Sequence, residues 1–114
     1  MRFGIGLGSG PDAERAAREA LAGARRTVRR PDLTLAFGSI YLDQKGVHKA
    51  LSGELEGGRL LGGSSFAEIS NAGVTKGTVA VLSLDLGGAP VALARASVGA
   101  PLRTGAALAK GLSG

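Results

Sequence analysis

The chain has 114 residues, a length that suits one domain with a single hydrophobic core. It contains no Cys and one His, so a disulfide scaffold, a thiol nucleophile, an iron–sulfur cluster and a multi-histidine metal centre are excluded. The formal net charge is +5 at pH 7, and most of the surplus lies in residues 1–30, which hold seven Arg and three carboxylates. We expect neither a bound metal nor a cofactor.

The first segment alternates apolar residues with glycine: Phe3, Ile5 and Leu7 with Gly4, Gly6 and Gly8. This period of two predicts a strand with one nearly bare face. Residues 13–28 repeat Ala, Leu and Val at three- and four-residue spacing, which predicts a helix whose apolar face is almost all Ala. Glycine inside a strand marks close approach by another backbone, so we expect this helix to lie directly on the glycine face.

The remaining segments are expected in this order: a strand at 33–37, a helix at 43–55 with Asp43 as its N-cap, a strand at 59–63, a long strand at 78–86, a returning strand at 91–98 and a helix at 103–112. The prediction is an α/β fold in the order β-α-β-α-β-β-β-α. Its mixed sheet has strands one to three parallel and the last two as an antiparallel hairpin, with helices packed on it. We take residues 1–114 as a single domain or as part of one.

Each of the three predicted parallel strands ends in small polar residues. In such sheets, ligands bind beyond the carboxyl ends of the strands, where Gly permits close approach and Ser offers hydrogen bonds. Turn geometry alone also places Gly and Ser at strand ends, so both interpretations stay open. The candidate ligand-binding residues are Ser9, Gly10, Ser39, Gly63, Ser64, Ser65 and Glu68.

Motifs of known enzyme classes are incomplete. Gly8-x-Gly10-x-x-Ala13 matches a dinucleotide fingerprint, but Asp32 precedes the second strand instead of following it. Gly63-x-Ser65-x-Ala67 resembles a nucleophile elbow, but no helix is predicted directly after it and the one His lies upstream. We therefore expect no catalytic activity. An enzyme with Ser65 or Ser39 as nucleophile is kept as an alternative.

The Arg-rich first helix offers a second alternative, a nucleic-acid-binding protein that uses Arg25, Arg26, Arg29 and Arg30. Four aromatic residues give little support for base stacking, and a solvated helix face is the favoured explanation of the charge. The N-terminus lacks a signal-peptide core, and Asp85, Gly87, Gly88 and Pro90 interrupt the most apolar stretch. We expect a cytoplasmic protein that is not anchored in a membrane.

Three segments together resemble the N-terminal domain of the FIST family, named for F-box and intracellular signal transduction proteins: residues 31–39 (PDLTLAFGS), 61–69 (LGGSSFAEI) and 78–82 (TVAVL). The resemblance spans about residues 5–112. It implies a non-catalytic sensory module of bacterial signal transduction that binds a small polar ligand, such as an amino acid or carboxylate. Glu68 and the turn at 62–65 match the family's Gly-Ser signature.

Members of this family usually carry a C-terminal FIST domain as well, so such a domain or a signalling module is an expected partner of this chain. The predicted sheet also exposes edges that invite pairing. A structural fragment that forms a homo-oligomer through the exposed sheet is therefore a further alternative.

Overall fold

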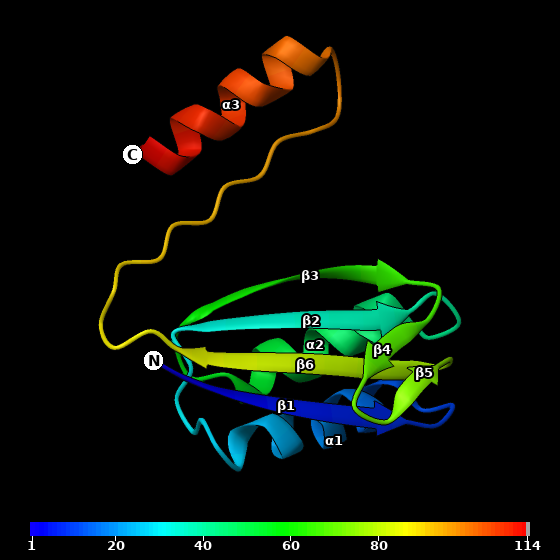
Figure 1. Cartoon of the computed structure of the whole chain (residues 1–114). Coiled ribbons are helices and arrows are strands. Elements are labelled where there is room, and N and C mark those ends of the chain that lie inside the picture. Colours follow the sequence, from blue (N-terminus) through cyan, green and yellow to red (C-terminus); the bar gives the residue numbers. More distant parts are fainter. Residues whose placement is uncertain (114) are drawn as a thin grey trace.

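A four-stranded mixed sheet forms the centre of the molecule (Figure 1). The computed structural model describes residues 1–113. The strands of this sheet are β1 (Arg2–Ser9), β2 (Leu33–Ser39), β3 (Arg59–Ser65) and β6 (Thr78–Asp85). Their order is β1-β6-β2-β3, with β6 antiparallel to both of its neighbours and β2 parallel to β3. The α/β class and the mixed sheet are confirmed.

Two helices cover one face of this sheet. They are α1 (Ala13–Arg25) and α2 (Gln44–Glu54). Asp12 caps α1 by accepting a hydrogen bond from the Arg15 amide at 3.2 Å, and Asp43 caps α2 by accepting one from the Lys45 amide at 3.1 Å, as predicted for Asp43. In Figure 1 both helices lie behind the sheet, so the face toward the viewer carries no helix.

The packing of α1 on β1 confirms the predicted contact between alanine and glycine. A Cβ atom on Gly4, Gly6 or Gly8 would overlap the carbonyl oxygen of Ala24, Ala20 or Ala16, respectively. Those three alanines are fully buried. Because the helix face carries only alanine methyl groups and the strand face carries no side chains, the helix backbone lies directly on the strand.

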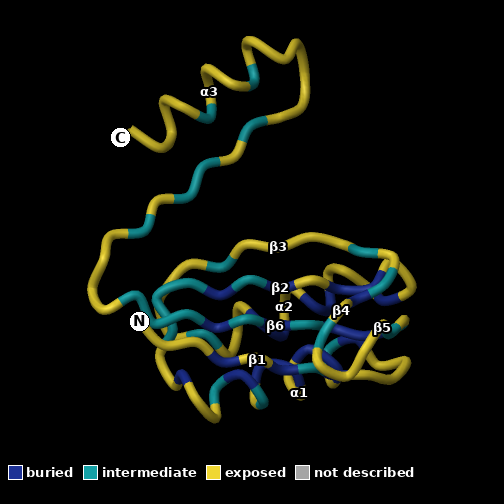
Figure 2. Tube along the Cα trace, in the orientation of Figure 1, coloured by how far each residue is buried: buried dark blue, intermediate teal, exposed yellow. Residues whose placement is uncertain are grey.

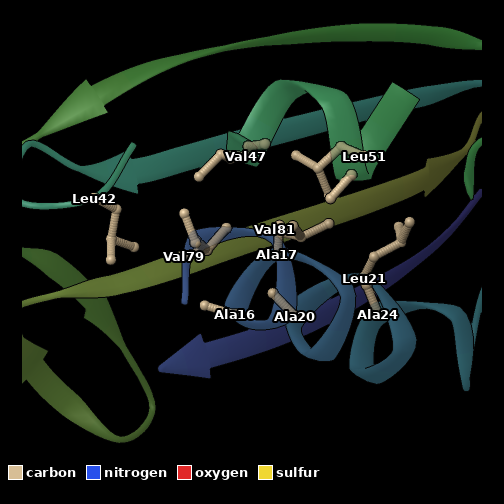
Figure 3. Close-up of a cluster of buried hydrophobic side chains, with 13 residues drawn as sticks. Ala16, Ala17, Ala20, Leu21, Ala24, Leu42, Val47, Leu51, Val79 and Val81 are labelled. Carbon is tan, nitrogen blue, oxygen red and sulfur yellow. The ribbon is translucent and has the colours of Figure 1, made fainter. Parts of the chain in front are cut away.

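The larger core residues lie further along the same face. Val79 and Val81 of β6 are buried between the two helices, with Leu21 of α1 and Val47 and Leu51 of α2 (Figure 3). Because the helix face of β1 is glycine, β6 and α2 supply most of the large side chains of this core.

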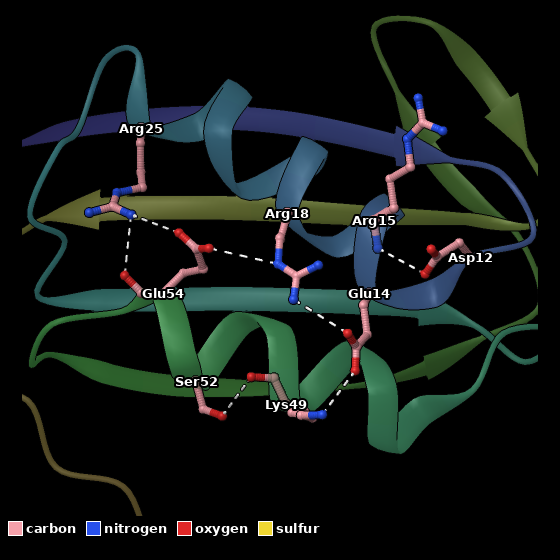
Figure 4. A network of polar contacts seen from close by, with 8 residues as sticks. All are labelled: Asp12, Glu14, Arg15, Arg18, Arg25, Lys49, Ser52 and Glu54. Carbon is pink, nitrogen blue, oxygen red and sulfur yellow. Dashed lines mark hydrogen bonds and ion pairs between the residues drawn. The ribbon is translucent and has the colours of Figure 1, made fainter.

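Charged residues join the outer surfaces of α1 and α2 (Figure 4). Arg18 contacts Glu14 at 3.3 Å and Glu54 at 3.7 Å, and Arg25 contacts Glu54 at 3.9 Å. Lys49 contacts Glu14 at 3.4 Å. Part of the Arg-rich face of α1 is therefore engaged by carboxylates of the protein itself.

The predicted hairpin of 78–86 with 91–98 is wrong in position. Residues 91–98 form no strand, and they cannot pair with β6 because both sides of β6 are occupied by β1 and β2. The antiparallel hairpin instead joins β4 (Glu68–Ser70) and β5 (Gly73–Thr75), which pair with each other as a separate small sheet. These three-residue strands are too short to show an alternating pattern in the sequence.

The last helix, α3 (Pro101–Ser113), confirms the helix predicted at 103–112 but is not packed on the sheet as expected. It has no buried residue, and an extended segment carries it away from the sheet (Figures 1 and 2). None of the helices in residues 1–113 has both the length and the apolar character needed to cross a membrane.

Candidate functional site

The carboxyl ends of β1, β2 and β3 meet at one edge of the sheet. All three run in the same direction, since β1 and β2 are each antiparallel to β6 and β3 is parallel to β2. Only β2 and β3 are direct neighbours, because β6 lies between β1 and β2. Ser9 pairs in register with Thr78, and Ser39 pairs with Ser65, so the predicted strand ends do converge.

The β4–β5 hairpin is attached to this edge through a buried carboxylate. Glu68, 3% exposed, accepts a hydrogen bond from the Ser65 hydroxyl at 2.5 Å and another from the Thr78 hydroxyl. The hydroxyls of Thr75 and Thr78 are 3.0 Å apart. Glu68 therefore links β3, β6 and the hairpin, and its carboxylate oxygens are already bonded within the protein.

Ser39 is likewise engaged within the fold. It is fully buried, and its hydroxyl oxygen accepts hydrogen bonds from the amides of Tyr41 at 3.3 Å and Gly77 at 3.2 Å. The Gly77 bond joins the end of β2 to the loop that leaves the hairpin. The hydroxyls of Ser39 and Ser65 thus hold the strand ends and the hairpin together. Neither hydroxyl is hydrogen-bonded to the His48 side chain, as a serine nucleophile activated by His48 would be.

Aromatic residues from two loops meet outside the same edge. The rings of Tyr41 and Phe66 are 6.0 Å apart at their centroids, and the Lys76 ammonium lies 4.6 Å from the centroid of Phe66. Both rings are more than half exposed. This contact joins the loops after β2 and β3 to the loop after the hairpin.

A groove of about 500 Å³ opens beside these residues, between α2 and the edge strand β3, on the helix-covered face of the sheet. Its volume lies within the range of small-molecule sites. Apolar side chains form most of its wall, and the glycines of β3 keep it open. The lining residues are Ala36, Gly38, Gln44, Val47, His48, Leu51, Leu60, Leu61, Gly62, Gly63 and Ser64.

Three residues with polar side chains line this groove. Gln44 and His48 are one helical turn apart on α2, and Ser64 of β3 pairs in register with Gly38. The Gln44 amide nitrogen donates to the carbonyl oxygens of Ser39 at 2.6 Å and Leu42 at 3.0 Å. This fixes the orientation of the amide, so its oxygen lies over Gly38 and is available to accept a hydrogen bond.

The structure therefore separates the predicted site residues into three groups. Gly63 and Ser64 line the groove. Ser39, Ser65 and Glu68 belong to the hydrogen-bonded edge, while Ser9 and Gly10 are exposed at the end of β1, outside the groove.

The sequence analysis named neither Gln44 nor His48 as a site residue. Their i, i+4 spacing on the predicted helix was the available signal, since it places both on one face. Within residues 1–113 no group of three or more His, Cys, Asp or Glu side chains could hold a metal ion.

Comparison with known proteins identifies one family. No curated protein matches the chain, whereas the family model of the FIST N domain matches residues 32–113. The matched region begins at β2, so β1 and α1 lie outside it although they pack against it. Since the match covers most of the chain, the protein belongs to the FIST N-domain family, a family of sensory domains in signal transduction that is not generally catalytic.

Proposed function

We propose that this domain senses a small polar molecule, and that the ligand binds in the groove between α2 and β3. The observation that carries this proposal is a groove of ligand size that is lined by Ser64, by His48 and by Gln44, whose amide oxygen is an unengaged acceptor. Sites of this kind combine apolar walls with a few polar groups that orient the ligand.

The polar groups favour an amino acid with an apolar side chain. The Gln44 oxygen can accept hydrogen bonds from an ammonium group, and the Ser64 hydroxyl and a ring nitrogen of His48 can donate to a carboxylate. Val47, Leu51 and Leu60 offer an apolar surface to the side chain. A simple carboxylate would use only the donors, so we expect it to bind more weakly than the amino acid.

Calorimetric titration and thermal shift with the apolar amino acids test this proposal. Binding stabilises the folded state, so the melting temperature should rise with ligand concentration. Replacing Ser64 with Ala should weaken binding about tenfold through loss of one hydrogen bond to a charged group. No heat and no shift with any amino acid or small carboxylate at millimolar concentration would contradict the proposal.

Blocking the groove gives a matched comparison on α2. His48 lines the groove and Lys45 does not, and both residues are exposed. A His48→Trp variant should fill part of the groove and abolish binding, whereas Lys45→Trp should bind as the unmodified protein does. Equal binding by both variants would place the ligand elsewhere.

A further inference from the structure

The face of the sheet opposite α1 and α2 is strongly apolar and carries no helix. The β4–β5 hairpin lies over one end of it, where Glu68 bonds to Ser65 and Thr78, and the rest of the face is open. Phe3 is 60% exposed, Ile5 53%, Phe37 46% and Leu61 50%, and the strand register places all four on this face. Half-buried Leu35 and Leu82 lie between them. Among the positions of β1, β2, β3 and β6 that alternate onto this face, Arg59 at the start of β3 is the one charged residue. A continuous apolar surface of this kind marks a docking site.

The same chain holds a helix that does not contact the sheet. Its contacts are with the extended segment before it, through Thr104, which bonds to Ser97 and Gly99, and through Gly111, which lies against Ala94. In α3, Leu102 is 89% exposed and Leu112 54%, and at 3.6 residues per turn these leucines share one face with Ala106 and Ala109. Arg103 and Lys110 lie on another side of the helix, with Ala107. An isolated helix of 13 residues is marginal in water, so α3 requires a surface to pack against.

We propose that α3 docks with its Leu102–Leu112 face on the open face of its own sheet and completes a three-layer α/β/α arrangement. The dimensions allow this. The 15 residues between β6 and α3 can span about 50 Å when extended, while the eight-residue β6 is about 26 Å long and α3 about 20 Å.

Charge and tethering both favour α3 over a second copy of the chain. Docking through the leucine face leaves Arg103 and Lys110 in solvent, and the covered sheet positions are almost free of charge. The linker also keeps α3 at an effective concentration in the millimolar range beside this face, far above that of a second molecule in dilute solution. The groove between α2 and β3 lies on the other face, so docking of α3 does not depend on the proposed ligand.

Crosslinking of paired cysteines tests this docking in the full chain, which has no Cys of its own. Leu82 is near the middle of the open face, Ala109 is on the leucine face of α3, and Ala107 is on its polar side. A Leu82→Cys/Ala109→Cys protein should form an intramolecular crosslink with a short bismaleimide at least about tenfold faster than a Leu82→Cys/Ala107→Cys protein.

A further change in α3 distinguishes specific docking from random collisions of the tethered helix with the sheet. Adding Ala109→Asp to a protein with a single Leu82→Cys should speed alkylation of that cysteine, whereas Ala107→Asp should leave the rate unchanged. Equal crosslinking rates for the two cysteine pairs would overturn the proposal. Crosslinks that form only between chains would overturn it as well, because a second copy would then cover this face.

Discussion

The carbonyl oxygen of Ala20 in α1 occupies the space that a side chain on Gly6 of β1 would fill. The same relationship joins Gly8 to Ala16 and Gly4 to Ala24, so three successive contacts seat the helix on the strand. This close approach determines where α1 lies and leaves no room for a methyl group on this face of β1.

A Gly6→Ala variant should therefore be strongly destabilised. The added Cβ meets backbone, which cannot rotate away, and we expect a loss of about 3 kcal/mol or more in the free energy of unfolding. Urea denaturation followed by circular dichroism measures this. Gly53→Ala on α2 is the control, because its Cβ meets nothing within 4 Å and it should gain about 0.5–1 kcal/mol. A loss below about 1 kcal/mol for Gly6→Ala would contradict the packing described.

The contact between β1 and α1 could be predicted because each of the two segments has a recognisable sequence pattern. Alternation of glycine with Phe3, Ile5 and Leu7 identifies the bare face, and the alanine spacing identifies the helix that covers it. The edge where Ser39 and Ser65 lie together was also predictable, since parallel strands end on the same side of a sheet.

The pairing of the strands was harder to predict from the sequence. Residues 91–98 alternate as a strand does, but alternation does not reveal whether a neighbouring position in a sheet is free, and both sides of β6 are taken. The function of Glu68 was hidden for a similar reason. Its burial depends on Thr78, ten residues away, and on a hairpin with no sequence pattern of its own.

Glu68→Ala tests whether the carboxylate holds the hairpin on the sheet. The change removes the acceptor of the Ser65 and Thr78 hydroxyls, and we expect a loss of about 2–3 kcal/mol in unfolding free energy. Hydrogen exchange of the β4 and β5 amides should accelerate more than that of β2. Glu56→Ala, at an exposed position, should change stability by less than about 0.5 kcal/mol. Equal effects of the two variants would show that the Glu68 carboxylate does not stabilise the attachment of the hairpin to the sheet.

The ion pairs between α1 and α2 should contribute little. A double-mutant cycle that replaces Arg18 and Glu54 with Ala should give a coupling energy below about 1 kcal/mol, because both side chains are about half exposed. The coupling should fall further in 1 M salt. A larger coupling that is insensitive to salt would mean that these charges are shielded from solvent, contrary to the surface network in Figure 4.

Ser83 presents the opposite case to Ser39. It is fully buried on β6, and its hydroxyl has no hydrogen-bond partner among the described residues. Burying a hydroxyl without a partner costs free energy, so Ser83→Ala should be neutral or should stabilise the protein by up to about 1 kcal/mol. Ser39→Ala removes an acceptor for the Tyr41 and Gly77 amides and should cost about 1–3 kcal/mol. Denaturation of both variants in parallel measures the contrast. A Ser83→Ala variant that loses as much stability as Ser39→Ala would reveal a bond to a buried water at Ser83.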